Sequence, residues 1–171
     1  EPIISHEIIP LNIDYLQEKH SCIYANINNI HIFGCHLDVY DNTDNSRCLQ
    51  LLTIFKKINL IKNNNILLLG DFNLLNKYQL NENEWNYIKR HDILRNIETK
   101  SIAINVIYDN DFIDTYDFLS KKPPKFTCCF DRRIDYIFIK NNTNLHILDI
   151  NEIYTNVSDH IPLIVHFKSK L

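Results

Sequence analysis

The chain has 171 residues, of which 45% are hydrophobic and 23% are charged. This composition is typical of a folded globular protein and excludes collagen-like, low-complexity and wholly disordered chains, while the length fits one domain with a buried core. The 18 basic and 21 acidic residues give a net charge of −3, which excludes nucleic-acid binding through bulk electrostatics alone. No apolar run approaches the roughly 18 residues that a membrane span needs.

Glycine is scarce in this sequence. It occurs only at Gly34 and Gly70, although a chain of this length would usually contain about a dozen glycines. The 28 isoleucines and 23 asparagines that accompany this scarcity are typical of translation from an AT-rich genome. Each glycine that remains under such pressure is therefore informative.

The cysteines and the start of the chain indicate its cellular context. Five cysteines form no C-x-x-C pair and no regular spacing, so we expect an intracellular, reducing compartment, the cytoplasm or nucleus, and no disulfide framework. The residues that follow Glu1 lack the basic and apolar regions of a signal peptide. Because the chain contains no methionine, we expect that it is truncated at its N-terminus.

The first predicted elements are a hairpin and a helix. Residues 22–27 and 30–36 predict two strands joined by the two-residue turn Asn28-Asn29. A helix should follow, capped by Asp44 or Ser46. Its apolar residues on one face are Leu49, Leu52, Ile54, Phe55 and Ile58.

The later elements alternate between strands and helices. Residues 66–69 are a short apolar run that ends at Gly70, as expected of a buried strand. Helices are expected over residues 82–91 and around 94–103, and strands near 126–129, 133–139, 145–154 and 163–167. This alternation, with hairpins late in the chain, favours an α/β sandwich over a sheet of parallel strands alone.

Two of the predicted strands reach a glycine and then a pair of polar residues. Asp71 and Asn73 should lie on one side of the chain after Gly70, while Phe72 turns toward the core. A carboxylate there can hold a proton or a metal, and an amide can donate to a phosphoryl oxygen. His36 and Asp38 should share a face after Gly34. Ordinary turns contain the same residue types. However, glycine permits close backbone approach at both places, which favours one shared site.

Two further segments carry polar residues in apolar surroundings. Period-two geometry places Arg133, Asp135 and Ile137 on one strand face, and a lone aspartate there is costly unless it is paired. His160 could supply the partner, and the adjacent Asp159 could hold a metal ion or a water molecule. The alternative is an ordinary turn before the last strand.

Together these segments resemble the C-terminal motifs of the endonuclease/exonuclease/phosphatase superfamily, over roughly residues 22–167. The four motifs are His-Leu-Asp at 36–38, Gly-Asp-Phe-Asn at 70–73, Arg-Ile-Asp-Tyr-Ile-Phe at 133–138 and Ser-Asp-His-Ile-Pro at 158–162. The resemblance implies a DNase I-like four-layer α/β/β/α sandwich, with residues 1–171 forming the C-terminal two-thirds of one such domain. It also implies a hydrolase of phosphodiester or phosphomonoester bonds that uses Mg²⁺ or Mn²⁺.

The resemblance assigns a role to each residue of the expected site. His36 would contact the phosphate, Asp71 would position or deprotonate the attacking water, and Asn73 would be the amide that stabilises the transition state. Asp135 would orient His160. These five residues are the expected catalytic group.

Other positions have weaker or structural counterparts in the family. Asp159 would be a metal or water ligand, whereas Arg47 and Gln50 would be structural. Glu18 imitates the family's metal-binding glutamate, but it lies only 18 residues before His36, so we expect a coincidental surface residue. Without that glutamate the oxygen ligands for Mg²⁺ are few.

A basic segment with interleaved aromatic residues surrounds Pro123-Pro124. Within it we expect Lys125, Arg132 and Arg133 to bind substrate, since cations meet phosphates while bases stack on rings. A solvated charged loop is an equally good interpretation. A phosphate ester is the expected substrate, with DNA or RNA somewhat favoured. The alternatives are a lipid or inositol-phosphate hydrolase of the same fold, or a degenerate module that binds without catalysis.

Overall fold

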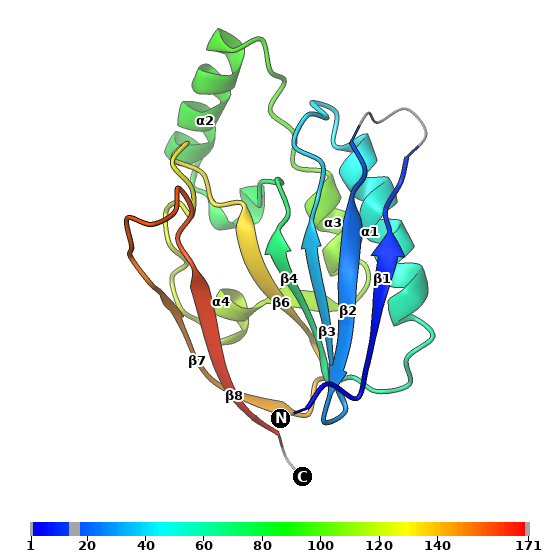
Figure 1. Cartoon of the computed structure of the whole chain (residues 1–171). Coiled ribbons are helices and arrows are strands. Elements are labelled where there is room, and N and C mark those ends of the chain that lie inside the picture. Colours follow the sequence, from blue (N-terminus) through cyan, green and yellow to red (C-terminus); the bar gives the residue numbers. More distant parts are fainter. Residues whose placement is uncertain (1, 14–17, 170–171) are drawn as a thin grey trace.

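The computed structural model describes residues 2–13 and 18–169 (Figure 1). The strands are β1 (Ser5–Pro10), β2 (Ser21–Ile27), β3 (Ile30–His36), β4 (Ile66–Asp71), β5 (Phe112–Asp114), β6 (Asp135–Lys140), β7 (Leu145–Glu152) and β8 (Leu163–Ser169). The helices are α1 (Asn45–Ile58), α2 (Glu82–Leu94), α3 (Ala103–Tyr108) and the single turn α4 (Thr115–Phe118), with a 3-10 turn at Lys77–Gln79. No helix in the described ranges is long and apolar enough to cross a membrane.

The strands form two sheets. Six of them make a mixed sheet in the order β1-β2-β3-β4-β6-β5, in which β3 and β4 run parallel and the other neighbours run antiparallel. The remaining two, β7 and β8, pair antiparallel as a separate sheet. The mixed topology agrees with the sandwich that the sequence predicted.

Each face of the large sheet is covered by a different layer (Figure 1). Phe33, Leu68 and Phe138 belong to the core that lies beneath α1 and α3. Leu67 and Ile137 belong to the core shared with β7 and β8. The described residues therefore form three layers, α/β/β. Within residues 2–13 and 18–169, no helical layer covers the outer face of β7 and β8.

The predicted hairpin is confirmed and its turn explains the asparagines. Asn28 and Asn29 both adopt positive φ, 53° and 59°, which is the backbone that a two-residue type I′ turn requires. Asparagine tolerates this conformation better than most residues. The turn fixes the antiparallel register of β2 against β3, and this register extends to Cys35, the residue before His36.

Helix α1 begins where predicted, but its cap works differently. Asp44 is the N-cap residue, yet its side chain makes no capping bond to α1. Its carboxylate instead accepts from Arg47 Nε at 2.6 Å and from the backbone N–H groups of Ile102 and Ala103, at the start of α3. Arg47 also donates to the carbonyl of Asp38, which confirms its structural role.

Some predicted elements were wrong. The predicted helix over 94–103 does not form, because α2 ends at Leu94 and Asn96 has a φ of 55°, which interrupts helical backbone. The segment 126–129 is not a strand and makes only isolated bridges through Cys128. In α1, Ile54, Phe55 and Ile58 are buried as predicted, whereas Leu49 and Leu52 are exposed and Leu51 is buried instead.

Candidate active site

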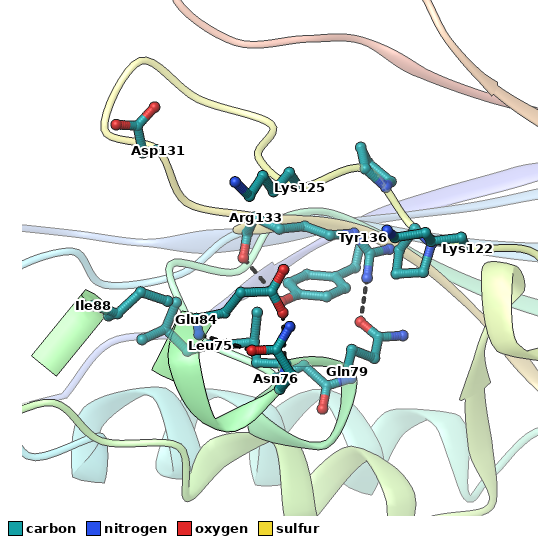
Figure 2. Close-up of a pocket in the computed structure, with 14 residues that line it drawn as sticks. Leu75, Asn76, Gln79, Glu84, Ile88, Lys122, Lys125, Asp131, Arg133 and Tyr136 are labelled. Atoms are coloured by element: carbon teal, nitrogen blue, oxygen red, sulfur yellow. Dashed lines mark hydrogen bonds between the residues drawn. The ribbon is translucent and has the colours of Figure 1, made fainter. Parts of the chain in front are cut away.

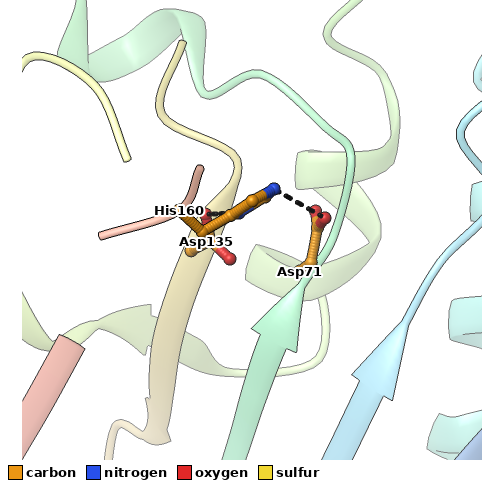
Figure 3. A group of neighbouring side chains, drawn as sticks. All are labelled: Asp71, Asp135 and His160. Atoms are coloured by element: carbon orange, nitrogen blue, oxygen red, sulfur yellow. Dashed lines mark hydrogen bonds and ion pairs between the residues drawn. The ribbon is translucent and has the colours of Figure 1, made fainter. Parts of the chain in front are cut away.

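Three of the predicted site residues lie in one row across the large sheet. His36 pairs in register with Asp71 between β3 and β4, and Asp71 pairs with Asp135 between β4 and β6. The row occupies the end of these strands, and His160 reaches it from the segment before β8 (Figure 3). Strand register thus aligns His36, Asp71 and Asp135, although 99 positions separate the first from the last.

Gly70 allows the row to form. Its φ is +133°, and a Cβ built on it would lie 1.9 Å from the carbonyl oxygen of Cys35. Gly34 has no such constraint, since a Cβ there would meet atoms no closer than 3.9 Å. The expectation that both glycines permit close backbone approach is therefore correct for Gly70 and wrong for Gly34. After Gly70, Phe72 turns into the core as predicted and is fully buried.

The two carboxylate oxygens of Asp71 face different partners. Oδ1 accepts the backbone N–H of Asn73 at 2.9 Å. Oδ2 lies 3.6 Å from His36 Nε2 and 3.9 Å from His160 Nε2. Burial raises the pKa of Asp71 and the charge of Asp135 adds to this rise, against the lowering effects of the Asn73 hydrogen bond and the two histidines. Asp71 is consequently a stronger proton acceptor than an exposed aspartate.

Asp135 and His160 form the pair that the sequence predicted. His160 Nδ1 lies 2.9 Å from Asp135 Oδ2. An ionised carboxylate can only accept, so Nδ1 carries the proton and Nε2 faces Asp71. Burial lowers the pKa of His160, but the hydrogen bond to Asp135 and the charges of Asp135, Asp71 and Asp159 outweigh it, and the pKa is raised. The positive form of the ring is favoured at this position.

Asn73 is near the row but is partly engaged. Its backbone has a φ of 49°, and its Nδ2 donates to the carbonyl oxygen of Leu37 at 2.9 Å. This bond joins the chain after β4 to the chain after β3. One amide hydrogen of Asn73 remains for a phosphoryl oxygen.

Three other acidic residues lie away from the row. Asp38 is buried and accepts from Ser46 Oγ and the backbone N–H of Asp41, so it does not share a site with His36. Asp159 is exposed, and its carboxylate lies 4.0 Å from Cys129 Sγ. Glu18 is also exposed, as expected of a surface residue. The rest of the motif that it imitates, residues 16–17, lies outside the described residues.

The described residues contain one group that fits a metal ion. Asp71, Asp135 and His160 each offer one ligand atom, and these atoms lie within 4.8 Å of one another. Two carboxylates completed by water suit Mg²⁺, and an added imidazole suits Mn²⁺. Asp159, the predicted metal ligand, is not part of this group.

The two predicted substrate-binding arginines are paired within the protein. Arg133 is buried, lies 4.4 Å over the ring of Tyr136 and pairs with Asp114 at 2.7 Å. It does not share a face with Asp135, because β6 begins only at Asp135 and the strand period does not extend back to it. Arg132 pairs with the buried Asp92.

Lys125 has a more open position. It lies on the rim of a cavity of about 230 Å³ together with Lys122, and Arg133 forms part of the cavity wall (Figure 2). Leu75 and Tyr136, which follow Asp71 and Asp135 in the chain, line the same cavity. Of the three predicted substrate-binding residues, Lys125 is the one whose side chain borders open space without an ion pair among the described residues.

Thr127 is a residue that sequence reasoning missed. It is fully buried and its hydroxyl accepts from the backbone N–H of Asp135. No sequence signal reveals this contact, because the partner is a backbone group and any residue type could provide it.

The comparisons with known proteins rest on structure. No family model and no curated protein matches the sequence. The chain is similar to the human Nocturnin catalytic domain with bound sulfate (16% identity, TM-score 0.63), covering 98% of this chain and 59% of that one. It is similar to an endonuclease/exonuclease/phosphatase family protein from Bacteroides thetaiotaomicron (15% identity, TM-score 0.63), covering 99% of this chain and 66% of that one. It is also similar to D. rerio TDP2 complexed with a single-strand DNA product (14% identity, TM-score 0.62), covering 98% of this chain and 68% of that one.

The similarity extends over nearly the whole chain but only part of each neighbour. The chain spans about three-fifths to two-thirds of the length of these solved structures. Identities of 14–16% support a shared fold and no finer relationship. The chain therefore shares the DNase I-like fold of these solved structures, the fold that the sequence motifs predicted.

Proposed function

We propose that the protein is a metal-dependent hydrolase of phosphoric esters. The observation that carries the proposal is the row His36–Asp71–Asp135, with His160 hydrogen-bonded to Asp135 and facing Asp71. It combines a carboxylate of raised pKa with two ring nitrogens directed toward the same space. A proton acceptor beside hydrogen-bond donors is what attack by water on a phosphoryl group needs.

The residues would divide the chemistry as follows. Water near Asp71 Oδ2 attacks phosphorus, its proton passes to Asp71, and the bond to the leaving oxygen breaks, after which the leaving oxygen takes up a proton from solvent. His36 and His160 donate from Nε2 to the phosphoryl oxygens, and Asn73 donates its remaining amide hydrogen. Asp135 keeps His160 oriented and positively charged. A divalent ion held by Asp71 and Asp135 would supply further positive charge to the same oxygens.

Activity assays test this proposal. The complete protein is incubated with bis-p-nitrophenyl phosphate and with a single-stranded oligonucleotide, in Mg²⁺, in Mn²⁺ and in EDTA. We expect metal-dependent hydrolysis that Asp71→Asn reduces on the order of 10²–10⁴-fold, the usual contribution of a general base. Glu18→Gln is the matched control and should change the rate less than a few-fold. Hydrolysis that survives EDTA or Asp71→Asn would refute the mechanism.

Among substrates, we propose a nucleic acid. Lys122 and Lys125 in the cavity lining support this choice, since lysine cations bind the phosphates of a nucleic acid. The same lining also contains the carboxylates of Glu84 and Asp131. A solved neighbour, TDP2, is described with a single-strand DNA product, while another, ANGEL2, is described as a 2′,3′-cyclic phosphatase (17% identity, TM-score 0.64). Faster hydrolysis of inositol phosphates or phospholipids than of oligonucleotides would favour the lipid-directed alternative.

A binding module without catalysis is the second candidate. It is favoured by the small number of oxygen ligands, because Asp71 and Asp135 are the two carboxylates of the described cluster and Asp135 is already bonded to His160. In this case neither the wild type nor Asp71→Asn would hydrolyse any ester. Both would still bind a labelled oligonucleotide, with an affinity that Lys125→Gln weakens.

A further inference from the structure

Thr127 makes hydrogen bonds in two directions. Its Oγ1 accepts from the backbone N–H groups of Ile134 and Asp135, each at 3.1 Å. Its carbonyl oxygen accepts from the backbone N–H of Ile161 at 2.7 Å. The residue is fully buried, so these bonds are shielded from water. One side chain and its own peptide thus bond next to both members of the Asp135–His160 pair.

The backbone around Asp135 gives it little other support on the edge of β6 that faces away from β4. β4 pairs with β6 along one edge, up to Asp71 opposite Asp135. On the other edge β5 pairs only with residues 138–140 of β6. The position of Asp135 on the β5 side is therefore fixed by Thr127 and not by a strand.

The chain around His160 is also irregular. His160 lies before β8 begins and bridges in isolation to Cys128, the neighbour of Thr127. The carbonyl oxygen of Thr127 accepts from the N–H of Ile161, the residue after His160. This bond helps to position the backbone of His160 and therefore its imidazole ring. Thr127 thus bonds to the backbone on both sides of the contact between His160 Nδ1 and Asp135 Oδ2, and Cys129 adds one bond, from its N–H to the carbonyl oxygen of Asp159.

We propose that Thr127 is a positioning residue that holds Asp135 against His160. Its effect on catalysis rests on the proposed function, whereas its effect on the hydrogen bond does not. Displacement of a catalytic group by about 1 Å can cost on the order of 10²-fold in rate. Loss of the hydroxyl would release the first residues of β6, since two buried N–H groups would then lack an acceptor.

The variants separate positioning from general stability. Thr127→Val keeps the shape and removes the acceptor, and Thr127→Ser keeps the acceptor. Thr115→Val is the matched control, because Thr115 is also fully buried and its hydroxyl also bonds to β6, at the carbonyl of Ile137, away from the site. If Thr127→Val does not fold, Thr127→Cys replaces it, since a thiol is a weaker acceptor.

Two measurements are made on each folded variant. The first is the downfield proton resonance of His160 Nδ1–H, assigned by its loss in His160→Ala. The second is kcat and KM on bis-p-nitrophenyl phosphate. We expect Thr127→Val to lose the resonance and to lower kcat about 10–100-fold with KM little changed. Thr127→Ser should restore both, and Thr115→Val should leave both intact.

The outcomes distinguish the two proposals. A resonance and a kcat that remain within twofold of wild type in Thr127→Val would overturn the positioning role. Equal losses in Thr115→Val would also overturn it, because the effect would then be general destabilisation. Absence of hydrolysis in the wild type refutes the proposed function, while the resonance still decides the role of Thr127.

Discussion

Replacing Gly70 by alanine should destabilise the fold strongly. The new Cβ would lie 1.9 Å from the Cys35 carbonyl oxygen, and the backbone would keep a φ of +133° that side chains rarely adopt. Such a backbone costs about 1–3 kcal/mol and forced overpacking about 1–3 kcal/mol, so the free energy of unfolding should fall by about 2–6 kcal/mol. For a chain of this size the loss corresponds to a Tm decrease between about 4 and 24 °C.

Gly34→Ala is the control for this prediction. A Cβ at Gly34 would make ordinary contacts, 3.9 Å to Leu69 Cδ1 and 4.0 Å to the carbonyl oxygen of Ile23. We expect its free energy of unfolding to stay within about 1 kcal/mol of wild type, since a compatible alanine also reduces the entropy of the unfolded chain. Urea and thermal unfolding followed by circular dichroism measure both variants. Equal destabilisation by the two substitutions would refute the steric reasoning.

Three further predictions concern charged groups. Because the pKa of His160 is raised in the folded protein, its pairing with Asp135 stabilises the fold fully at pH values below the pKa of the unfolded state, and this stabilisation is lost as pH rises through the pKa of the folded state. Asp135→Asn should therefore lower the free energy of urea unfolding more at pH 5.5 than at pH 9. The pKa of Asp71 is raised, so its ionisation opposes folding as pH rises; Asp71→Asn should melt no lower than wild type at pH 8, and a lower Tm would contradict this. Arg133→Gln would leave the buried Asp114 without its cation and should cost about 3–5 kcal/mol in urea unfolding, whereas a loss below 1 kcal/mol would show that the pair is dispensable.

The sequence was informative where backbone periodicity continued. The alternation after Gly70 correctly placed Phe72 in the core. The register of β4 against β6, which the sequence did not predict, places Asp135 opposite Asp71. The cost of a lone aspartate in an apolar strand correctly predicted a histidine partner for Asp135. Register then brought His36 to the same row. The predicted relations depend on local geometry that a sequence specifies.

The errors arose where side chains bond to backbone or where a strand stops. Arg133 was placed by extrapolating the strand period past its first residue. Asp38 was expected to share a face with His36, but it is buried and satisfied by neighbouring N–H and hydroxyl groups that no spacing reveals. The same is true of Thr127. Such partners depend on tertiary contacts, which spacing along the chain does not encode.

The carboxylate of Asp44 joins two distant parts of the chain into one cooperative unit. It accepts from the first amides of α3, at Ile102 and Ala103, and from Arg47, which in turn holds the carbonyl of Asp38 in the loop after β3. Opening α3 alone would leave a buried carboxylate and guanidinium partly unsatisfied, so the helix and the loop should open together. In native-state hydrogen exchange, the amides of Ala103 and Asp38 should therefore share one opening free energy, although 64 residues lie between them.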